Sequence, residues 1–215
     1  MLLRWYGVVC LWGLVGAWAA PVPLVNGDFE GGVGADGVPV GWSRYGGGGE
    51  TTSLRVLAHP DGAGHGLEIR AGDGTRAIGV TQRFPLEAGQ GHRVTVMARV
   101  AGGATAEGAH VQLRFSPGDR FVQVGVRGDP GGAVRETAVT AVAPAGSTQA
   151  TVYIYTHAQP TPCVVVDRVQ AETVELTAIH AEAAAMPNPE PPVYTSLKDL
   201  HLETPLVSAG APSAR

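Results

Sequence analysis

The 215-residue chain has little cysteine and no excess of basic charge. Its two cysteines are Cys10 and Cys163, and Cys10 lies in an N-terminal segment that we expect to be removed, so no intrachain disulfide can form. Stability must therefore come from a packed core or from a bound metal. The 15 Lys and Arg residues are interspersed with 19 Asp and Glu residues, which excludes a basic stripe and argues against a nucleic-acid partner.

The sequence also lacks the short motifs of common catalytic and metal sites. It contains no His-x-x-x-His, Cys-x-x-Cys, Gly-x-Ser-x-Gly or phosphate-loop motif. Cys163 lies between Pro162 and a run of valines, so we interpret it as a small buried apolar residue and not as a nucleophile. The seven histidines show no ligand spacing, and a zinc pair is considered only for His59 and His65, which flank a glycine-rich loop.

Paired acids, the minimum for glycoside hydrolysis, are not evident either. The candidate acids are scattered, mostly in turns or next to arginines: Glu68, Glu87, Glu107, Asp119 and Asp129. We therefore predict that the chain is not an enzyme. The enzymatic alternative requires two carboxylates that converge in one cleft.

Residues 1–20 have the layout of a secretory signal peptide. Arg4 precedes an apolar run that ends at Val15, and small residues follow. We place the cut after Ala19, which makes residues 1–19 the signal peptide. The alternative is an uncleaved anchor, but the run is shorter than the roughly 20 residues that span a bilayer. We expect a secreted, extracellular protein without membrane contact after cleavage, and a periplasmic or cell-surface location stays open.

Residues 20–177 are predicted to form one all-β domain. Short stretches rich in Val, Thr, Tyr and Phe alternate between two faces, and Gly, Pro, Asp and Asn separate them. The examples are 52–57 (TSLRVL), 66–70 (GLEIR), 93–100 (RVTVMARV), 110–115 (HVQLRF), 121–126 (FVQVGV) and 151–155 (TVYIY). The recurring turn signals favour a two-sheet antiparallel β-sandwich of the jelly-roll type.

One of the predicted strands carries aliphatic side chains on one face and tyrosines on the other. In 151–157, Val152 and Ile154 alternate with Tyr153 and Tyr155. Such a strand is either buried on both sides or exposes a recognition surface. If the strands pair as jelly-roll neighbours, the tyrosines share a face with three polar residues, Gln112, Arg114 and Gln123. That face would offer stacking surfaces and donors to sugar hydroxyls, and burial of the rings against another element is the alternative.

The composition changes after the predicted domain. Residues 178–195 read as a linker rich in Pro and Ala, and residues 196–215 alternate like a strand. About twenty residues cannot bury enough apolar surface to fold alone. This tail either packs back onto the sandwich or begins a further domain, and we favour the second reading.

Five motifs in order resemble the carbohydrate-binding modules of the CenC type. They are 25–30 (VNGDFE), 39–42 (PVGW), 85–90 (PLEAGQ), 143–152 (APAGSTQATV) and 164–169 (VVVDRV). The resemblance covers roughly 150 residues and implies a galactose-binding-like β-sandwich. It also implies that Trp42 packs at the sandwich edge, whereas Phe29 in the first motif would fill the core.

The same resemblance implies a structural calcium ion between the first and last strands. Carried over onto this sequence, its ligands would be Glu30 and Asp167, with Asp28 as a further ligand or carbonyl donor. Asp167 is the one acid in an apolar strand, and an isolated buried charge is costly unless it is paired or bound to a cation. The alternative is a salt bridge of Asp167 or Glu30 with Arg168 or Arg44.

Together these features predict a secreted, non-catalytic carbohydrate-binding module. Its partner would be a polysaccharide or oligosaccharide, held by Tyr153 and Tyr155 with their polar neighbours. We expect the module to be accessory to a polysaccharide-degrading enzyme, such as a glycoside hydrolase or polysaccharide lyase whose catalytic domain would follow the linker. The alternative is a structural or protein-interaction β-sandwich that binds no glycan.

Overall fold

The structure is a computed structural model that describes residues 19–47, 51–59, 64–72, 76–100, 108–129, 131–157 and 160–175. Within these ranges the regular structure consists of strands. They are β1 (Ala20–Val22), β2 (Ser43–Tyr45), β3 (Thr52–Ala58), β4 (His65–Ala71), β5 (Gly79–Pro85), β6 (Gly91–Val100), β7 (Ala109–Ser116), β8 (Phe121–Gly125), β9 (Arg135–Val142), β10 (Gln149–Thr156) and β11 (Thr161–Val174).

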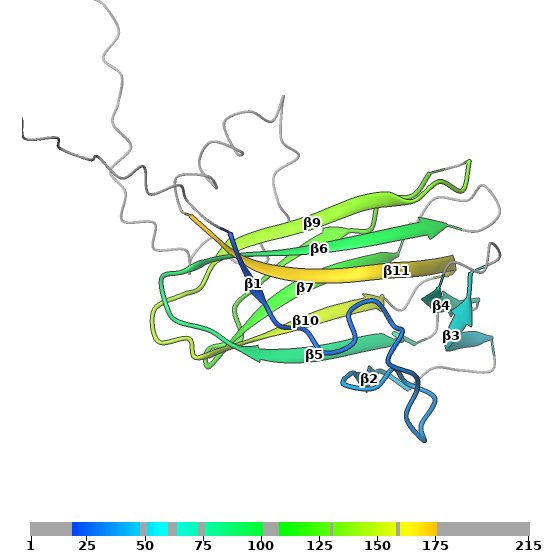
Figure 1. Cartoon of the computed structure of the whole chain (residues 1–215), viewed down its shortest axis with the longest axis horizontal. Helices are drawn as coiled ribbons and strands as arrows, with labels where there is room; N and C mark the ends of the chain where they lie inside the picture. The colour runs from blue at the N-terminus through cyan, green and yellow to red at the C-terminus, as the bar shows by residue number, and fades with distance from the viewer. Residues whose placement is uncertain are drawn as a thin grey trace, which may run out of the picture.

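The strands form two antiparallel sheets that pack face to face as a sandwich, as the alternation predicted (Figure 1). The first sheet has the order β3-β4-β11-β6-β9, with β1 added along the end of β11. The second sheet has the order β2-β5-β10-β7-β8. Apart from the consecutive pairs β3-β4 and β7-β8, neighbours in each sheet come from distant parts of the sequence. Strand order and register therefore decide which residues share a face.

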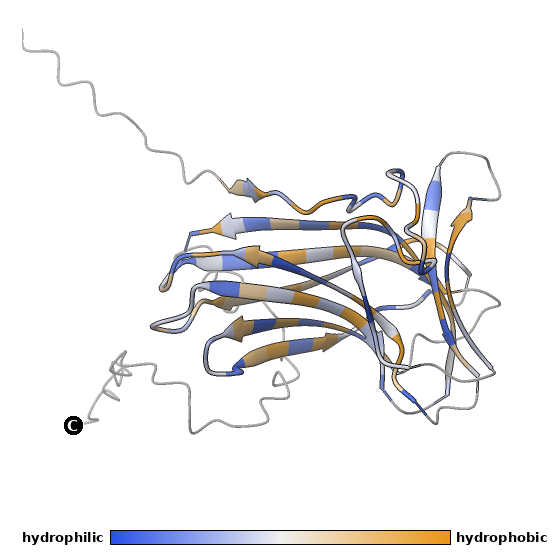
Figure 2. Ribbon diagram, turned by 90° about the horizontal axis from the view of Figure 1, so that it is seen from below, coloured by the Kyte–Doolittle hydropathy of each residue, from blue (hydrophilic) through white to orange (hydrophobic). Residues whose placement is uncertain are grey.

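The core lies between the sheets and uses one side of each strand. Val94, Val96 and Ala98 on β6 are fully buried, as are Val111 and Leu113 on β7. Figure 2 shows hydrophobic and hydrophilic residues alternating along the strands of both sheets. Removing these aliphatic side chains from water is the main driving force for the fold, so the period-two pattern determines which face of each strand points inward.

The segment between β1 and β2 closes one side of the sandwich. Phe29 is 1% exposed, and its ring centroid lies 5.9 Å from that of Trp42, whose indole N–H donates to the carbonyl of Asn26 at 3.1 Å. Gly27 accepts a hydrogen bond of 2.7 Å from the Val169 amide, and a Cβ at this glycine would lie 2.4 Å from the Val169 carbonyl oxygen. The predicted packing roles of Phe29 and Trp42 are confirmed.

The two ends of the described domain lie side by side. Ala20 pairs with Thr173 where β1 joins β11, and Figure 1 shows both ends on the same side of the sandwich. The predicted signal peptide, except Ala19, and the predicted linker and tail lie outside the described residues. In the part of the chain that the structure describes, no helix has the length and apolar character needed to cross a membrane.

Candidate functional site

The outer side of the second sheet brings together the five predicted ligand-binding residues. Tyr153 on β10 pairs with Gln112 on β7, which pairs with Gln123 on β8. Two residues along, Thr151 pairs with Arg114. We call the outer surface of this sheet the aromatic face, and define it by Tyr45, His110, Gln112, Arg114, Phe121, Gln123, Tyr153, Tyr155 and His157.

Three tyrosines pack edge to face at the centre of the aromatic face. The ring centroid of Tyr45 lies 5.3 Å from that of Tyr153 and 5.1 Å from that of Tyr155, with interplanar angles of 89° and 75°. Such pairs each contribute about 0.5–1.5 kcal/mol beyond the area that they bury. The sequence reasoning missed Tyr45, because it belongs to a three-residue strand whose place in the sheet depends on its pairing with β5.

Tyr155 is the buried member of this tyrosine cluster. It is 5% exposed, its hydroxyl donates to the side-chain oxygen of Gln123 at 2.7 Å, and its ring contacts Tyr45 and His157. Burial raises the pKa of Tyr155 to about 12, so the phenol stays protonated and remains a donor. Gln112 is equally buried. Both residues lie on the predicted face, but as placed they are too covered for direct contact with a ligand.

Two histidines border the tyrosines and were likewise not selected from the sequence, although the alternation placed them on this side. The rings of His110 and His157 lie 4.3 Å apart, edge to face. Nδ1 of His110 lies 3.1 Å from the Gly108 carbonyl and must therefore donate, which places its proton there in the neutral ring. Burial, followed by the nearby charge of His157, lowers the pKa of His110.

Arg114 lies between two aromatic rings. Its guanidinium carbon is 5.6 Å from the ring centroid of Phe121 and 5.6 Å from that of Tyr153. The side chain is 38% exposed, and its one ion pair in the described residues is a 4.0 Å contact with Asp119, itself 87% exposed. The accessible part of the aromatic face thus combines partly exposed rings (Tyr45, Phe121, Tyr153) with Arg114, Gln123 and the exposed His157.

The residues predicted as calcium ligands have other partners. Oε1 of Glu30 accepts the His65 backbone N–H at 2.6 Å, and Oε2 lies 2.8 Å from the His65 ring nitrogen Nδ1. These hydrogen bonds lower the pKa of Glu30. The Asp28 carboxylate accepts the backbone N–H of Glu30 at 3.2 Å.

Asp167 is the extra residue of a β-bulge. The pairing of β11 with β6 shifts register between Val166 and Arg168, so the strand pattern is interrupted at Asp167. Its Oδ1 lies 3.1 Å from Nη2 of Arg99 and 3.6 Å from Nε2 of His59. The salt-bridge alternative is therefore the arrangement seen, with Arg99 in place of the arginines that the sequence suggested.

These contacts do not fit a metal centre as the side chains are placed. Glu30 and Asp167 contact different basic residues, and His59 and His65 do not converge on one carboxylate. Across the described ranges no group of three or more His, Cys, Asp or Glu side chains is arranged to hold a metal ion. Calcium binding stays a prediction from the resemblance.

Cys163 belongs to a polar network on the first sheet and not to the apolar core. It is partly exposed, and its thiol donates to Glu68 at 3.4 Å. Burial, and secondly the hydrogen bond to Glu68 and its negative charge, raise the pKa of the Cys163 thiol to about 11. The reactive thiolate form is therefore disfavoured. Glu68 also accepts hydrogen bonds from Ser53 at 2.5 Å and Arg55 at 2.9 Å. The raised pKa supports the expectation that Cys163 is not a nucleophile. The predicted reason, burial among apolar residues, was wrong, because the thiol lies beside the Glu68 carboxylate.

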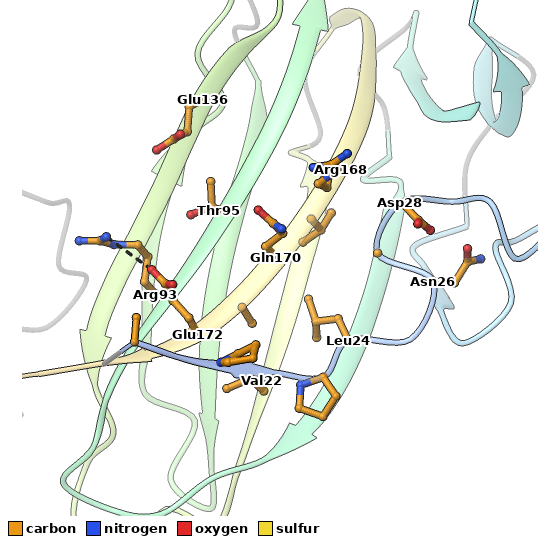
Figure 3. A pocket seen from close by; sticks show the side chains of 16 residues that line it. Val22, Leu24, Asn26, Asp28, Arg93, Thr95, Glu136, Arg168, Gln170 and Glu172 are labelled. Atoms are coloured by element: carbon orange, nitrogen blue, oxygen red, sulfur yellow. Dashed lines mark ion pairs between the residues drawn. The ribbon is translucent and has the colours of Figure 1, made fainter. Parts of the chain in front are cut away.

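A groove of about 740 Å³ lies on the outer side of the first sheet, away from the aromatic face. Figure 3 shows its side chains extending from β1, β6, β9 and β11 and from the loop after β1. Arg93 and Glu172 in its lining form an ion pair at 3.5 Å. None of the described residues that line the groove is aromatic, so these residues offer no stacking surface for a sugar ring.

Comparison with protein-family models and with curated proteins finds no match. Among solved structures, the chain is similar to the CBM22-1 xylan-binding domain of Xyn10C from Paenibacillus barcinonensis. The TM-score is 0.51 at 14% identity, over 74% of this chain and 99% of that one. The match shows the same β-sandwich fold as in a carbohydrate-binding module.

Other solved structures with this fold are named for functions other than carbohydrate binding. A Stig cyclase, Fisc, from Fischerella sp. TAU gives a TM-score of 0.56 at 17% identity, over 73% of this chain and 98% of that one. The enzymatically active domain of the bacteriophage CBA120 tailspike protein 4 gives 0.53 at 13% identity, over 71% of this chain but 21% of that one. At these identities the similarities establish the fold alone: a two-sheet β-sandwich of the kind found in carbohydrate-binding modules.

Proposed function

We propose that this chain is a secreted, non-catalytic carbohydrate-binding module of the CenC type, and that the aromatic face holds the glycan. The observation that supports this most strongly is the packing of Tyr45, Tyr153 and Arg114. Two partly exposed rings and a guanidinium group are held in fixed positions on one surface.

Sugar recognition follows from the chemistry of these side chains. The apolar C–H surface of a pyranose ring packs on an aromatic ring, and its hydroxyl groups need hydrogen-bond partners. Tyr153 supplies the ring, and Gln123 and Arg114 beside it supply the donors. Because the tyrosines already support one another, little side-chain freedom is lost on binding.

A binding role fits the aromatic face better than hydrolysis. Glycoside hydrolysis uses two carboxyl groups on either side of the scissile bond. The strands of the second sheet, β2, β5, β7, β8 and β10, contain no Asp or Glu. We therefore place any catalytic activity in another domain, such as that of a polysaccharide-degrading enzyme to which the module is accessory.

The second candidate function is a structural or protein-interaction domain. The burial of Tyr155 and Gln112 favours it, because these two polar side chains serve the packing of the sheet and are not accessible. The two candidate functions predict different binding measurements. If the domain has a structural or protein-interaction role alone, the wild-type protein binds no polysaccharide, and replacing accessible side chains of the aromatic face does not change this result.

Affinity electrophoresis and calorimetry against a panel of neutral and acidic polysaccharides test the proposal. We expect Tyr153→Ala to weaken binding by on the order of tenfold or more, whereas Tyr153→Phe retains most of it because the ring remains. Arg168→Gln, on the outer side of the first sheet, is the control and should bind like the wild type. Absence of binding to every polysaccharide, with folded protein and with calcium present, would contradict the proposal.

A further inference from the structure

The two sheets differ in charge. The strands of the second sheet contain three arginines, Arg44, Arg83 and Arg114, and no acidic residue. The strands of the first sheet contain both signs, and each of Glu68 and Asp167 is paired with an arginine. An anion on the aromatic face therefore meets no carboxylate from the strands themselves, and the exposed Asp119 beside Arg114, between β7 and β8, is the acid that it would have to displace.

Arg114 is positioned as an anion partner. The Phe121 and Tyr153 rings hold its guanidinium group from two sides, which restricts its orientation before a ligand arrives. A planar guanidinium presents two parallel N–H donors that match a carboxylate. Its present partner, Asp119, is 4.0 Å away and highly exposed, so this ion pair is weak and screened by solvent.

A second guanidinium group lies in the same row across the sheet. Arg83 on β5 pairs with Thr151 on β10, and Thr151 pairs with Arg114 on β7. Arg83 is exposed, and its neighbour Phe84 points into the core, so Arg83 is on the outer side with Arg114. Two strand spacings, about 9.5 Å, separate the two backbone positions. A polymer that crosses the strands meets a positive charge on both sides of Thr151.

We propose that the aromatic face selects acidic glycans, with the carboxylate of a uronic acid residue on Arg114 and the sugar ring on Tyr153. This inference rests on the proposed function and specifies its ligand class. A neutral glycan makes the stacking contact and hydrogen bonds between its hydroxyl groups and the side chains of Arg114 and Gln123. A uronate adds a charge-assisted, bidentate hydrogen bond, and a polymer of uronates adds attraction to Arg83.

The first comparison of the test uses polymers that differ in the carboxylate alone. Polygalacturonate is compared with its methyl ester by calorimetry, and alginate, glucuronoxylan and unsubstituted xylan extend the panel. For wild-type protein we expect at least tenfold tighter binding of an acidic polymer than of its neutral counterpart. Raising the salt concentration should reduce this difference, because exposed charges are screened.

Substitutions of Arg114 and Arg83 test whether these two residues cause the preference for acidic polymers. Arg114→Gln should remove most of the preference for the acidic polymer, and Arg114→Lys should restore part of it, because lysine keeps the charge but not the bidentate geometry. Arg83→Gln, at an exposed position, should reduce the preference by a smaller factor and keeps the test valid if Arg114→Gln fails to fold. Arg168→Gln is the matched control on the first sheet and should change nothing.

The outcomes separate the two proposals. Equal affinity for acidic and neutral polymers, or a preference that survives both Arg114→Gln and Arg83→Gln, would overturn the inference and leave glycan binding in place. Loss of binding to all polymers in Tyr153→Ala, together with loss of the acidic preference alone in Arg114→Gln, supports both. Binding to no polymer at all overturns both.

Discussion

The hydroxyl group of Tyr155 donates a 2.7 Å hydrogen bond to the side chain of Gln123, which links two strands that are not neighbours in the sheet. β7 lies between them, so the bond spans the aromatic face beside His110. Gln123 also lies 3.1 Å from Nε2 of His157. One buried phenol therefore positions two side chains of the accessible surface.

Tyr155→Phe tests this positioning role. The substitution keeps the ring and removes the donor, which leaves the Gln123 oxygen without its partner. We expect a loss of about 1 kcal/mol in the free energy of unfolding, measured by denaturant titration. Tyr153→Phe is the comparison, since Tyr153 is less buried. Equal stability of Tyr155→Phe and wild type would show that the hydrogen bond contributes nothing.

Phe29→Ala tests the closure of the sandwich by the segment before β2. Phe29 is fully buried and packs against Trp42, so truncation leaves a cavity. We expect a loss of about 3–5 kcal/mol. Val25→Ala in the same segment is the control, because Val25 is exposed and should cost much less. A similar loss for both variants would contradict the assignment of Phe29 to the core.

The stability of the domain should fall at mildly acidic pH. His92 is 1% exposed, neither ring nitrogen has a hydrogen-bond partner in the described residues, and burial lowers its pKa. The pKa of His110 is lowered as well. The unfolded chain then binds more protons than the folded one, so stability is present above the unfolded pKa of about 6.5 and is lost as the pH falls below it.

Denaturant titrations between neutral and acidic pH measure this loss. His92→Leu removes one titrating group and should flatten the pH dependence of the free energy of unfolding below pH ~6.5. Val25→Ala is a control, because Val25 is exposed and carries no titrating group, so the pH dependence should stay as in the wild type. An unchanged pH dependence in His92→Leu would rule out His92 as a source of the acid sensitivity.

Asp167→Asn distinguishes the ion pair from the predicted calcium site. The variant removes the charge that faces Arg99 and His59, and we expect a lower melting temperature. If the contact with Arg99 accounts for the effect, the decrease is the same with calcium and with chelator. A wild-type melting temperature that rises with calcium, and no longer does so in Asp167→Asn, would instead establish the calcium site, since a ligand held by the folded state stabilises it.

The sequence by itself determined the all-β sandwich and, within each strand, which side chains point away from the core, among them Tyr153, Gln112, Arg114 and Gln123. A strand that buries one of its faces must alternate apolar and polar side chains, and this alternation can be recognised in each strand by itself. The burial of Phe29 was predicted from its motif, although the residue lies in a turn and not on an alternating strand. These conclusions depend on local patterns that any pairing of the strands would preserve.

The tertiary structure alone decided how covered each residue is and which partner it contacts. Tyr45 reaches Tyr153 because β2 pairs with β5, and no local pattern encodes that pairing. Tyr155 is buried because Tyr45 and His157 pack against it. Asp167 meets Arg99 because a bulge in β11 shifts its register against β6. Such contacts depend on strand order and register, which are set by the packing of the whole domain.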